Sequence, residues 1–350
     1  MAEVVASGND KGMTAWVRYF WREYNLYVVL AALVAISAFL SDDFLTVRNI
    51  SNLLLRCSFN GLISLGMTFV ILVAGIDLSV GALFAFAGVF LSTMLHGAFF
   101  KFMPGVNQAF EAGGALNPIL PLWSMILLTL LAGAFFGLIN GLLVTKAKMQ
   151  AFAATLGTMV AVRGLAFTYT GGFPIPEVTA GVQWMGNGEI GGIPVPVLFW
   201  LGAAVICHVV LRFTVFGQSV YAVGAGERAA LMSGLKVDWV KIRAYIISGL
   251  LAALAGILMI GRMNAAEPRE GAGYELDAIA AAVIGGTLLS GGKGSILGTV
   301  AGVVILGLIA NILNLINVPP YPQQVAKGII ILVAVLAQRL SIRNRGESRG

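Results

Sequence analysis

Two glycine-rich segments resemble phosphate-binding loops, and neither has all the features that such loops need. Residues 224–229 read Gly-Ala-Gly-Glu-Arg-Ala and match a dinucleotide fingerprint by letters, but no strand–helix–strand unit is predicted around them. Residues 291–295 are similar to a Walker A loop, yet Thr287 stands where the first glycine belongs, and Gly294 replaces the hydroxyl residue that would hold magnesium. We therefore expect that this chain binds no cofactor and does not hydrolyse ATP.

The sequence also lacks the motifs that are typical of hydrolytic or metal-dependent catalysis. His96 and His208 have no second histidine, cysteine pair or carboxylate at a metal-ligand spacing. The chain contains no HExxH or GxSxG sequence. We therefore predict no catalytic residue and no metal site, and an intramembrane enzyme has little support.

Four ionisable side chains lie within or at the ends of apolar stretches, where charge often marks a proton or ion path. These four, Asp77, Arg163, Asp277 and Lys327, are the main candidates for such a path, although Arg56 also lies within a predicted span. Most of them sit near predicted helix ends, where charge is tolerated, and Arg163 is close enough to an outer helix end to reach the interface. Because there is no chain of carboxylates and no ring of like charges, a proton-coupled pump and an ion channel are both disfavoured.

Uncharged polar side chains are better represented in the apolar stretches. Hydroxyl and amide groups replace hydrogen bonds to water without a fixed charge, which suits a path for a neutral, hydroxyl-rich solute. The alternative is hydrogen bonding between helices, at about 0.6 kcal/mol for each bond. With the aspartate and serine of one glycine-bounded turn, the candidate path residues are Asp77, Ser79, Asn140, Thr155, Thr158, Asn311 and Asn314.

These polar residues are carried by a chain suited to the lipid bilayer. Of its 350 residues, 58% are hydrophobic and 11% are charged, and its mean hydropathy is +0.90, whereas soluble domains have about 25% charged residues. The apolar runs are too long for the strands of a membrane barrel. Stretches of about 20 residues predict an all-α inner-membrane bundle of about ten transmembrane helices, at 26–40, 51–74, 82–100, 122–145, 151–170, 196–215, 244–263, 277–291, 295–316 and 324–340.

The basic residues indicate which side of the membrane each loop occupies. With the N-terminus in the cytoplasm, few basic residues fall in the outer loops or at outer span ends, namely Arg48, Lys101, Arg262 and Arg269. The positive-inside rule then places both termini and the polar segment 216–243 in the cytoplasm. The net charge of +6 is therefore a signal of topology, and we predict no nucleic-acid partner.

This topology divides the chain into three parts. We expect a cytoplasmic N-terminal segment at 1–24, a transmembrane domain at 25–340 that includes the cytoplasmic segment 216–243, and a cytoplasmic tail at 341–350. The whole is predicted to be a multi-pass protein of the bacterial inner membrane.

Two glycine-flanked turns interrupt the apolar stretches in a similar way. Residues 74–81 read Ala-Gly-Ile-Asp-Leu-Ser-Val-Gly, and residues 284–292 read Ile-Gly-Gly-Thr-Leu-Leu-Ser-Gly-Gly. Glycine allows a helix to break or the chain to reverse, while serine and aspartate side chains bond the freed backbone groups. Both a plain helix terminus and a discontinuous helix beside a transport path fit this pattern.

The polar segment 216–243 predicts a short, separately capped helix outside the bilayer. Gly226 and Glu227 suit the start of a helix, where backbone N–H groups lack partners, and Gly234 suits its end. The apolar side chains of this helix are spaced to form one small docking face, made by Leu231, Met232 and Leu235.

Four segments of the chain resemble the membrane subunits of ribose-type ABC importers. They are residues 66–81 (GMTFVILVAGIDLSVG), 154–158 (ATLGT), 223–235 (VGAGERAALMSGL) and 273–286 (GYELDAIAAAVIGG), and the likeness covers about residues 45–340. The resemblance implies a monosaccharide importer with two permease subunits, here expected to form a homodimer. It also implies a cytoplasmic ABC ATPase that holds ATP and magnesium, and a periplasmic sugar-binding protein.

By the same likeness, the short polar helix corresponds to the coupling helix that sits in a cleft of the ATPase. The implied coupling residues are Gly226, Glu227, Arg228, Leu231, Met232, Ser233, Gly234 and Leu235. Ribose is the leading substrate hypothesis, with another pentose, galactose, a polyol or a related small neutral solute as the alternative. A secondary transporter or channel that works without an ATPase is the alternative of another class.

Overall fold

The computed structural model describes residues 26–336 except 27, 98–115, 117, 119, 320, 331, 334 and 335. The predicted N-terminal segment 1–24, the tail 341–350 and the last residues of the predicted span 324–340 lie outside the described residues. The cytoplasmic placement of both termini therefore stays a prediction.

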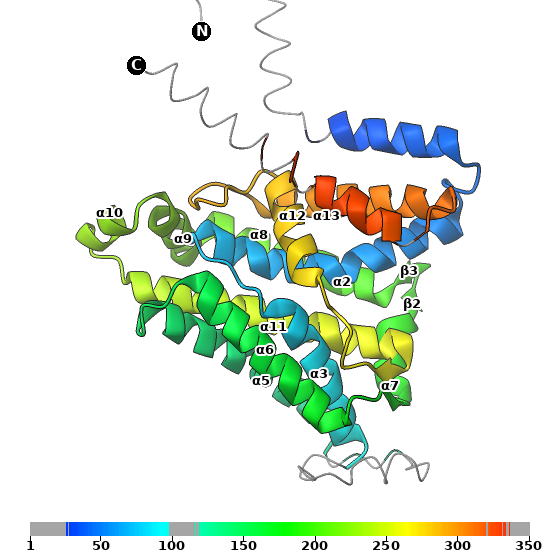
Figure 1. Ribbon diagram of the computed structural model, residues 1–350, viewed down its shortest axis with the longest axis horizontal. Coiled ribbons are helices and arrows are strands. Elements are labelled where there is room, and N and C mark those ends of the chain that lie inside the picture. The colour runs from blue at the N-terminus through cyan, green and yellow to red at the C-terminus, as the bar shows by residue number, and fades with distance from the viewer. Residues whose placement is uncertain are drawn as a thin grey trace, which may run out of the picture.

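Long apolar helices make up most of the described part of the molecule (Figure 1). Among the described residues, 6 helices are long and apolar enough to cross a membrane, and they are α2 (Val47–Leu72), α5 (Leu122–Thr145), α6 (Ala151–Thr170), α8 (Val195–Phe213), α11 (Val237–Met263) and α13 (Ile296–Leu315). Two shorter apolar helices are Val28–Leu40 and α3 (Val80–Leu95). The predicted helical bundle is confirmed, while the count of ten crossings stays a prediction.

Several predicted boundaries agree with the structure, and others differ for identifiable reasons. The bounds of α5 and α6 are those predicted. Helix α11 begins at Val237 rather than at 244, because a polar first turn with Asp238 carries it beyond the apolar span. The predicted span 277–291 is instead the shorter α12 (Tyr274–Ile284), which ends at Gly285 because Gly286 adopts a left-handed conformation with φ of 88°.

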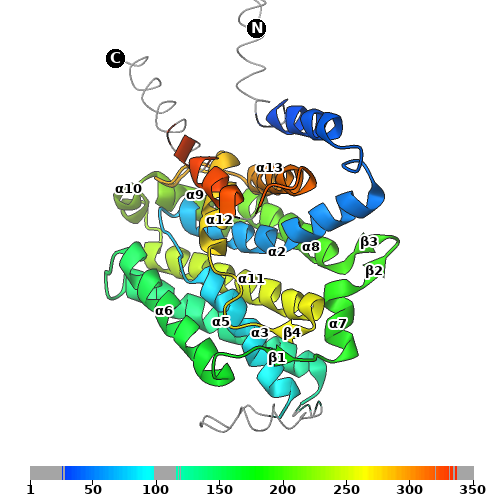
Figure 2. The same cartoon turned by 45° about the vertical axis from the view of Figure 1, so that its right-hand side comes forward.

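Small elements mark the two ends of the bundle (Figures 1 and 2). At one end lie α9 (Val215–Ala225) and α10 (Glu227–Met232). At the other end lie α7 (Ala180–Asn187) and two short antiparallel pairs: β1 (Ile175–Pro176) with β4 (Ala265–Ala266), and β2 (Glu189–Ile190) with β3 (Ile193–Pro194). The last described helical residues are 321–330, 332, 333 and 336.

Helices α2 and α11 form the centre of the bundle, and most of their residues are buried. Small residues let the neighbouring helix α5 approach α11 closely. A Cβ added at Gly137 would overlap the carbonyl oxygen of Tyr245, and one added at Gly249 would overlap that of Gly133. Close backbone contact of this kind is how helices pack in lipid, and here it brings polar side chains of α5 and α11 to a common point.

Candidate functional site

The first glycine-flanked turn is a break in the bundle at residues 73–79, which we call the first break. Helix α2 ends at Leu72 and α3 begins at Val80. After α2 the chain turns back, and α3 runs beside α11 toward the end of the molecule that carries α7 (Figures 1 and 2). A span with a non-helical connection of this kind needs other groups to bond its free backbone.

Asp77, which is fully buried, organises the first break. Its Oδ1 accepts hydrogen bonds from the backbone N–H of Ser79 at 3.1 Å and from the Ser79 hydroxyl at 2.6 Å. Its Oδ2 accepts from the Ser248 hydroxyl of α11 at 2.9 Å. The Asn140 amide of α5 donates to Ser79 Oγ at 2.8 Å and to Asp77 Oδ1 at 3.3 Å. The carboxylate therefore ties the break to two neighbouring helices.

The backbone of the first break is bonded by side chains as well. The carbonyl oxygen of Ile76 accepts from the Tyr245 hydroxyl of α11 and from the Thr155 hydroxyl of α6, both at 3.3 Å. Three helices thus converge on one segment of non-helical chain. The sequence-based list found Thr155 but missed Tyr245 and Ser248, although two polar side chains three residues apart in an apolar span share a helix face.

The other predicted path residues lie away from this cluster. Thr158 donates to the carbonyl of Ala154 on its own helix at 3.1 Å. Asn311 of α13 exchanges amide hydrogen bonds with Asn49 of α2, at 2.8 and 3.1 Å. Asn314 accepts from Gln323 at 3.0 Å. The structure therefore joins Asp77, Ser79, Asn140 and Thr155, and leaves these three apart; the path role of all seven stays a prediction.

The other three ionisable candidates, Arg163, Asp277 and Lys327, also have partners. Arg163 of α6 donates to the carbonyl oxygens of Pro268 at 2.8 Å and Glu270 at 2.7 Å, in the connection between β4 and α12. Lys327 forms an ion pair with Asp277 of α12 at 2.8 Å. Within the described residues, no group of three or more histidine, cysteine or acidic side chains could hold a metal ion.

The second glycine-flanked turn forms a second break at residues 285–295, between α12 and α13. Its loop is closed by backbone bonds from Leu288 N–H to the Lys293 carbonyl and from Gly291 N–H to the Leu288 carbonyl, both at 2.9 Å. Ser295 caps α13 by accepting from Gly298 N–H at 3.0 Å. The N–H of Gly292 donates to the carbonyl of Leu72 at 3.0 Å. The two similar segments thus lie close together, since a Cβ added at Gly291 would also crowd the backbone nitrogen of Ala74.

The short helix predicted in the polar segment is present as α10. Gly226 separates it from α9, with φ of 178°, and Glu227 occupies its first turn. At its end, Gly234 N–H donates to the Leu231 carbonyl at 3.0 Å and Leu235 N–H donates to the Ala230 carbonyl at 3.1 Å. With the left-handed Gly234 this is a Schellman motif, which ends a helix sharply.

The side chains of α10 divide between the surface and the interior of the protein. Met232 is 89% exposed and Leu231 is 63% exposed. Ala230 is buried, and Leu235 packs against the core. Two bulky apolar side chains therefore project from a helix that the protein holds from its other face.

An ion pair fixes α10 to the longest helix of the bundle. The carboxylate of Glu227 accepts from Lys241 of α11 at 2.7 Å. Arg228 beside it is exposed. The sequence-based list included Glu227 but not Lys241, whose contact depends on how α10 folds back on α11. Glu227 thus has a partner inside this chain.

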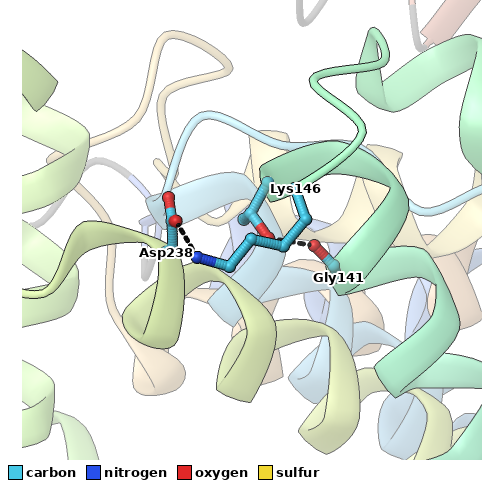
Figure 3. A network of polar contacts seen from close by, with 4 residues as sticks. Gly141, Lys146 and Asp238 are labelled. Carbon is cyan, nitrogen blue, oxygen red and sulfur yellow. Dashed lines mark hydrogen bonds and ion pairs between the residues drawn. The ribbon is translucent and has the colours of Figure 1, made fainter.

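The connection between α5 and α6 lies at the same end and is tied to the start of α11 (Figure 3). Lys146 forms an ion pair with Asp238 at 2.6 Å, and the Thr145 hydroxyl donates to the Gly141 carbonyl at 2.7 Å. Both partners of the ion pair are largely exposed, so solvent screens it. The pair therefore contributes little stability where the α5–α6 connection meets the start of α11.

Comparisons with known proteins agree with this architecture. A family model described as "Branched-chain amino acid transport system / permease component" matches residues 49–335. The chain is 47% identical to the ribose import permease protein RbsC of Bacillus subtilis (strain 168), over 89% of this chain and 91% of that protein.

Two further relatives cover nearly the whole chain. The ribose import permease protein RbsC of Haemophilus influenzae is 40% identical over 91% of this chain and 93% of that protein. The D-allose transport system permease protein AlsC of Escherichia coli (strain K12) is 36% identical over 92% of this chain and 93% of that protein. No solved structure matches the chain. Together with the apolar helices, these relatives identify a multi-pass protein of the inner membrane, and the chain belongs to the family of membrane permease subunits of ribose-type ABC importers.

Proposed function

We propose that this chain passes ribose through the inner membrane as the permease subunit of an ATP-driven importer. The observation that carries the proposal is α10, a helix with a Schellman end at one end of an apolar bundle, with Leu231 and Met232 exposed at the surface. A soluble partner would cover these side chains, because large apolar groups that are exposed on a helix at the end of the bundle are typical of interaction sites.

The partner that binds α10 would be an ABC ATPase that holds the ATP and magnesium. Both segments that resemble phosphate loops have other roles in the fold. Residues 224–229 join two helices, and the second break turns its Gly292 N–H toward the Leu72 carbonyl rather than toward a ligand. Energy would therefore come from the partner, and this chain would bind no cofactor.

Ribose is the best-supported cargo because the two relatives at 47% and 40% identity are named for it. The D-allose relative at 36% identity makes another monosaccharide the second candidate. A periplasmic sugar-binding protein would deliver the cargo at the end opposite α10, where Trp184 of α7 and Ile190 of β2 are each more than half exposed. A second copy of this permease would complete the transport path.

Reconstitution tests the proposal. Proteoliposomes with this chain, its cognate ATPase and the binding protein should accumulate labelled ribose in an ATP-dependent manner. A panel of D-allose, galactose and other pentoses would establish the cargo. Ribose uptake down a gradient by this chain alone would instead identify a secondary transporter or channel.

Matched substitutions locate the docking site. Leu231→Asp combined with Met232→Asp should abolish co-purification of the ATPase and lower uptake more than about tenfold, since buried apolar anchors dominate interface energies. Leu45→Asp is the control, because Leu45 is exposed to a similar degree, 61% against 63% for Leu231, and lies before α2 at the other end. Equal ATPase binding by the Leu231/Met232 variant and the wild type would contradict the role of α10.

A further inference from the structure

The backbone of α9 meets the end of α2 and the second break at a single point, close to Gly224. The Gly292 N–H of the second break donates to the Leu72 carbonyl at the end of α2. A Cβ added at Gly224 would overlap both the Leu72 carbonyl oxygen and the Gly292 nitrogen. Three backbone segments can therefore meet only because residue 224 has no side chain.

A second contact joins α9 to the same loop. The Tyr221 hydroxyl donates to the carbonyl oxygen of Gly294 at 3.0 Å. Tyr221 and Gly224 are three residues apart, so they lie on one face of the helix. Helix α9 thus holds the second break at two points along that face.

The position of α9 in the chain gives these contacts a mechanical consequence. Helices α9 and α10 are separated only by Gly226, whose N–H donates to the Ala222 carbonyl at 3.2 Å. This connection is one residue long, so a displacement of α10 would be passed to α9. The second break, which α9 contacts, connects α12 directly to α13.

The two segments that α9 contacts, the end of α2 and the second break, differ in how readily they can move. The Leu72 end belongs to α2, most of which is buried in the bundle. The second break contains exposed residues and three glycines with left-handed φ, namely Gly286, Gly291 and Gly292. Glycine changes backbone conformation at little steric cost, so a push from α9 would reshape the second break against a fixed α2.

We propose that Tyr221 and Gly224 are positioning residues that transmit movement of the coupling helix to the second break, and through it to α12 and α13. The proposal rests on the proposed function, because it requires that an ATPase moves α10. It adds the route by which that movement enters the membrane domain.

The test measures sugar transported per ATP hydrolysed in the complete reconstituted importer. Tyr221→Phe removes only the hydroxyl that bonds Gly294 and should lower this ratio by about 2- to 10-fold, the range expected for a contact in a coupling network. Gly224→Ala separates the three backbones and should lower it further. ATPase binding should be unchanged in both variants, since α10 keeps its exposed face.

Two control variants separate transmission from general disturbance. Gly202→Ala adds a methyl group to α8 at a position with no heavy atom within 4 Å, and Tyr321→Phe changes a tyrosine that is 80% exposed. Both should keep the wild-type ratio. If Gly224→Ala does not fold, Tyr221→Phe alone tests the transmission role, because it removes a single hydrogen bond.

The failures of the two proposals look different. Wild-type ratios in Tyr221→Phe with the ATPase still bound would overturn the transmission role and leave the proposed function intact. A wild-type chain that binds no ATPase would overturn the proposed function, and this inference with it.

Discussion

The two breaks interrupt helices in the same bundle and touch each other, but they are stabilised in different ways. In the first break, side chains from α5, α6 and α11 bond the chain, and Asp77 is fully buried. In the second break, the loop is closed mainly by its own backbone bonds, and Ser290, Lys293 and Ser295 are exposed. One break is held by the surrounding helices, and the other is held largely by its own conformation.

This difference assigns the breaks different parts in a moving transporter. A dense network of buried hydrogen bonds resists movement, because each bond lost leaves a further group without a partner in a low-dielectric interior. A glycine loop with exposed residues can change shape at lower cost, because water can bond many of the groups that it frees. The first break therefore acts as a fixed point, and the second break is the segment that follows α9.

The largest expected effect comes from removing the centre of the first break. Asp77→Ala should lower the unfolding free energy by about 3 kcal/mol, because Ser79 and Ser248 lose their acceptor inside the bundle. Thermal unfolding in detergent measures this loss. Asp77→Asn, which keeps one acceptor oxygen, should lose less.

Asp42→Ala is the control for a lost carboxylate, since Asp42 is exposed in the connection before α2. Its unfolding free energy should stay within about 0.5 kcal/mol of the wild type. If Asp77→Ala is as stable as Asp42→Ala, the first break is not held by its side chains.

A smaller loss of unfolding free energy is expected from substitution in the second break, where it would come from backbone strain rather than from lost contacts. Gly286 has φ of 88° and no heavy atom within 4 Å of an added Cβ. Gly286→Ala should therefore lower the unfolding free energy by about 1 kcal/mol through strain alone. The same unfolding assay detects it.

Gly157→Ala supplies the matched control for Gly286→Ala. It also adds a methyl group where no heavy atom lies within 4 Å, but in the helical backbone of α6, so it should be neutral or slightly stabilising. If the two alanine variants are equally stable, the left-handed backbone at Gly286 does not require glycine, and the predicted strain is absent.

Local signals in the sequence predicted the elements well. The bounds of α5 and α6 follow from predominantly apolar runs of the length that crosses a bilayer, and α10 follows from the glycines and glutamate around a few helix-forming residues. The repeat of glycine-flanked turns was visible too. These features depend on neighbours in the chain, so they can be recognised without the fold.

Contacts between distant segments were not predictable in the same way. Leu72 and Gly292 are far apart in sequence, and only the packing of α2, α9 and the second break brings them together. Ser248 and Tyr245 face Asp77 and Ile76 because of the rotation of α11, which close contact with the glycines of α5 fixes. Lys241 reaches Glu227 only after α10 folds back. Sequence patterns identify polar residues but not the helix faces that they share.

Hydrogen exchange in the assembled importer, with and without bound ATP, tests the division of roles most directly. Amides at residues 286–294 should change their exchange rates when ATP binds the partner, while amides at residues 75–79 should keep theirs, because only the second break follows α9. Equal changes in both segments, or a change confined to residues 75–79, would contradict the account.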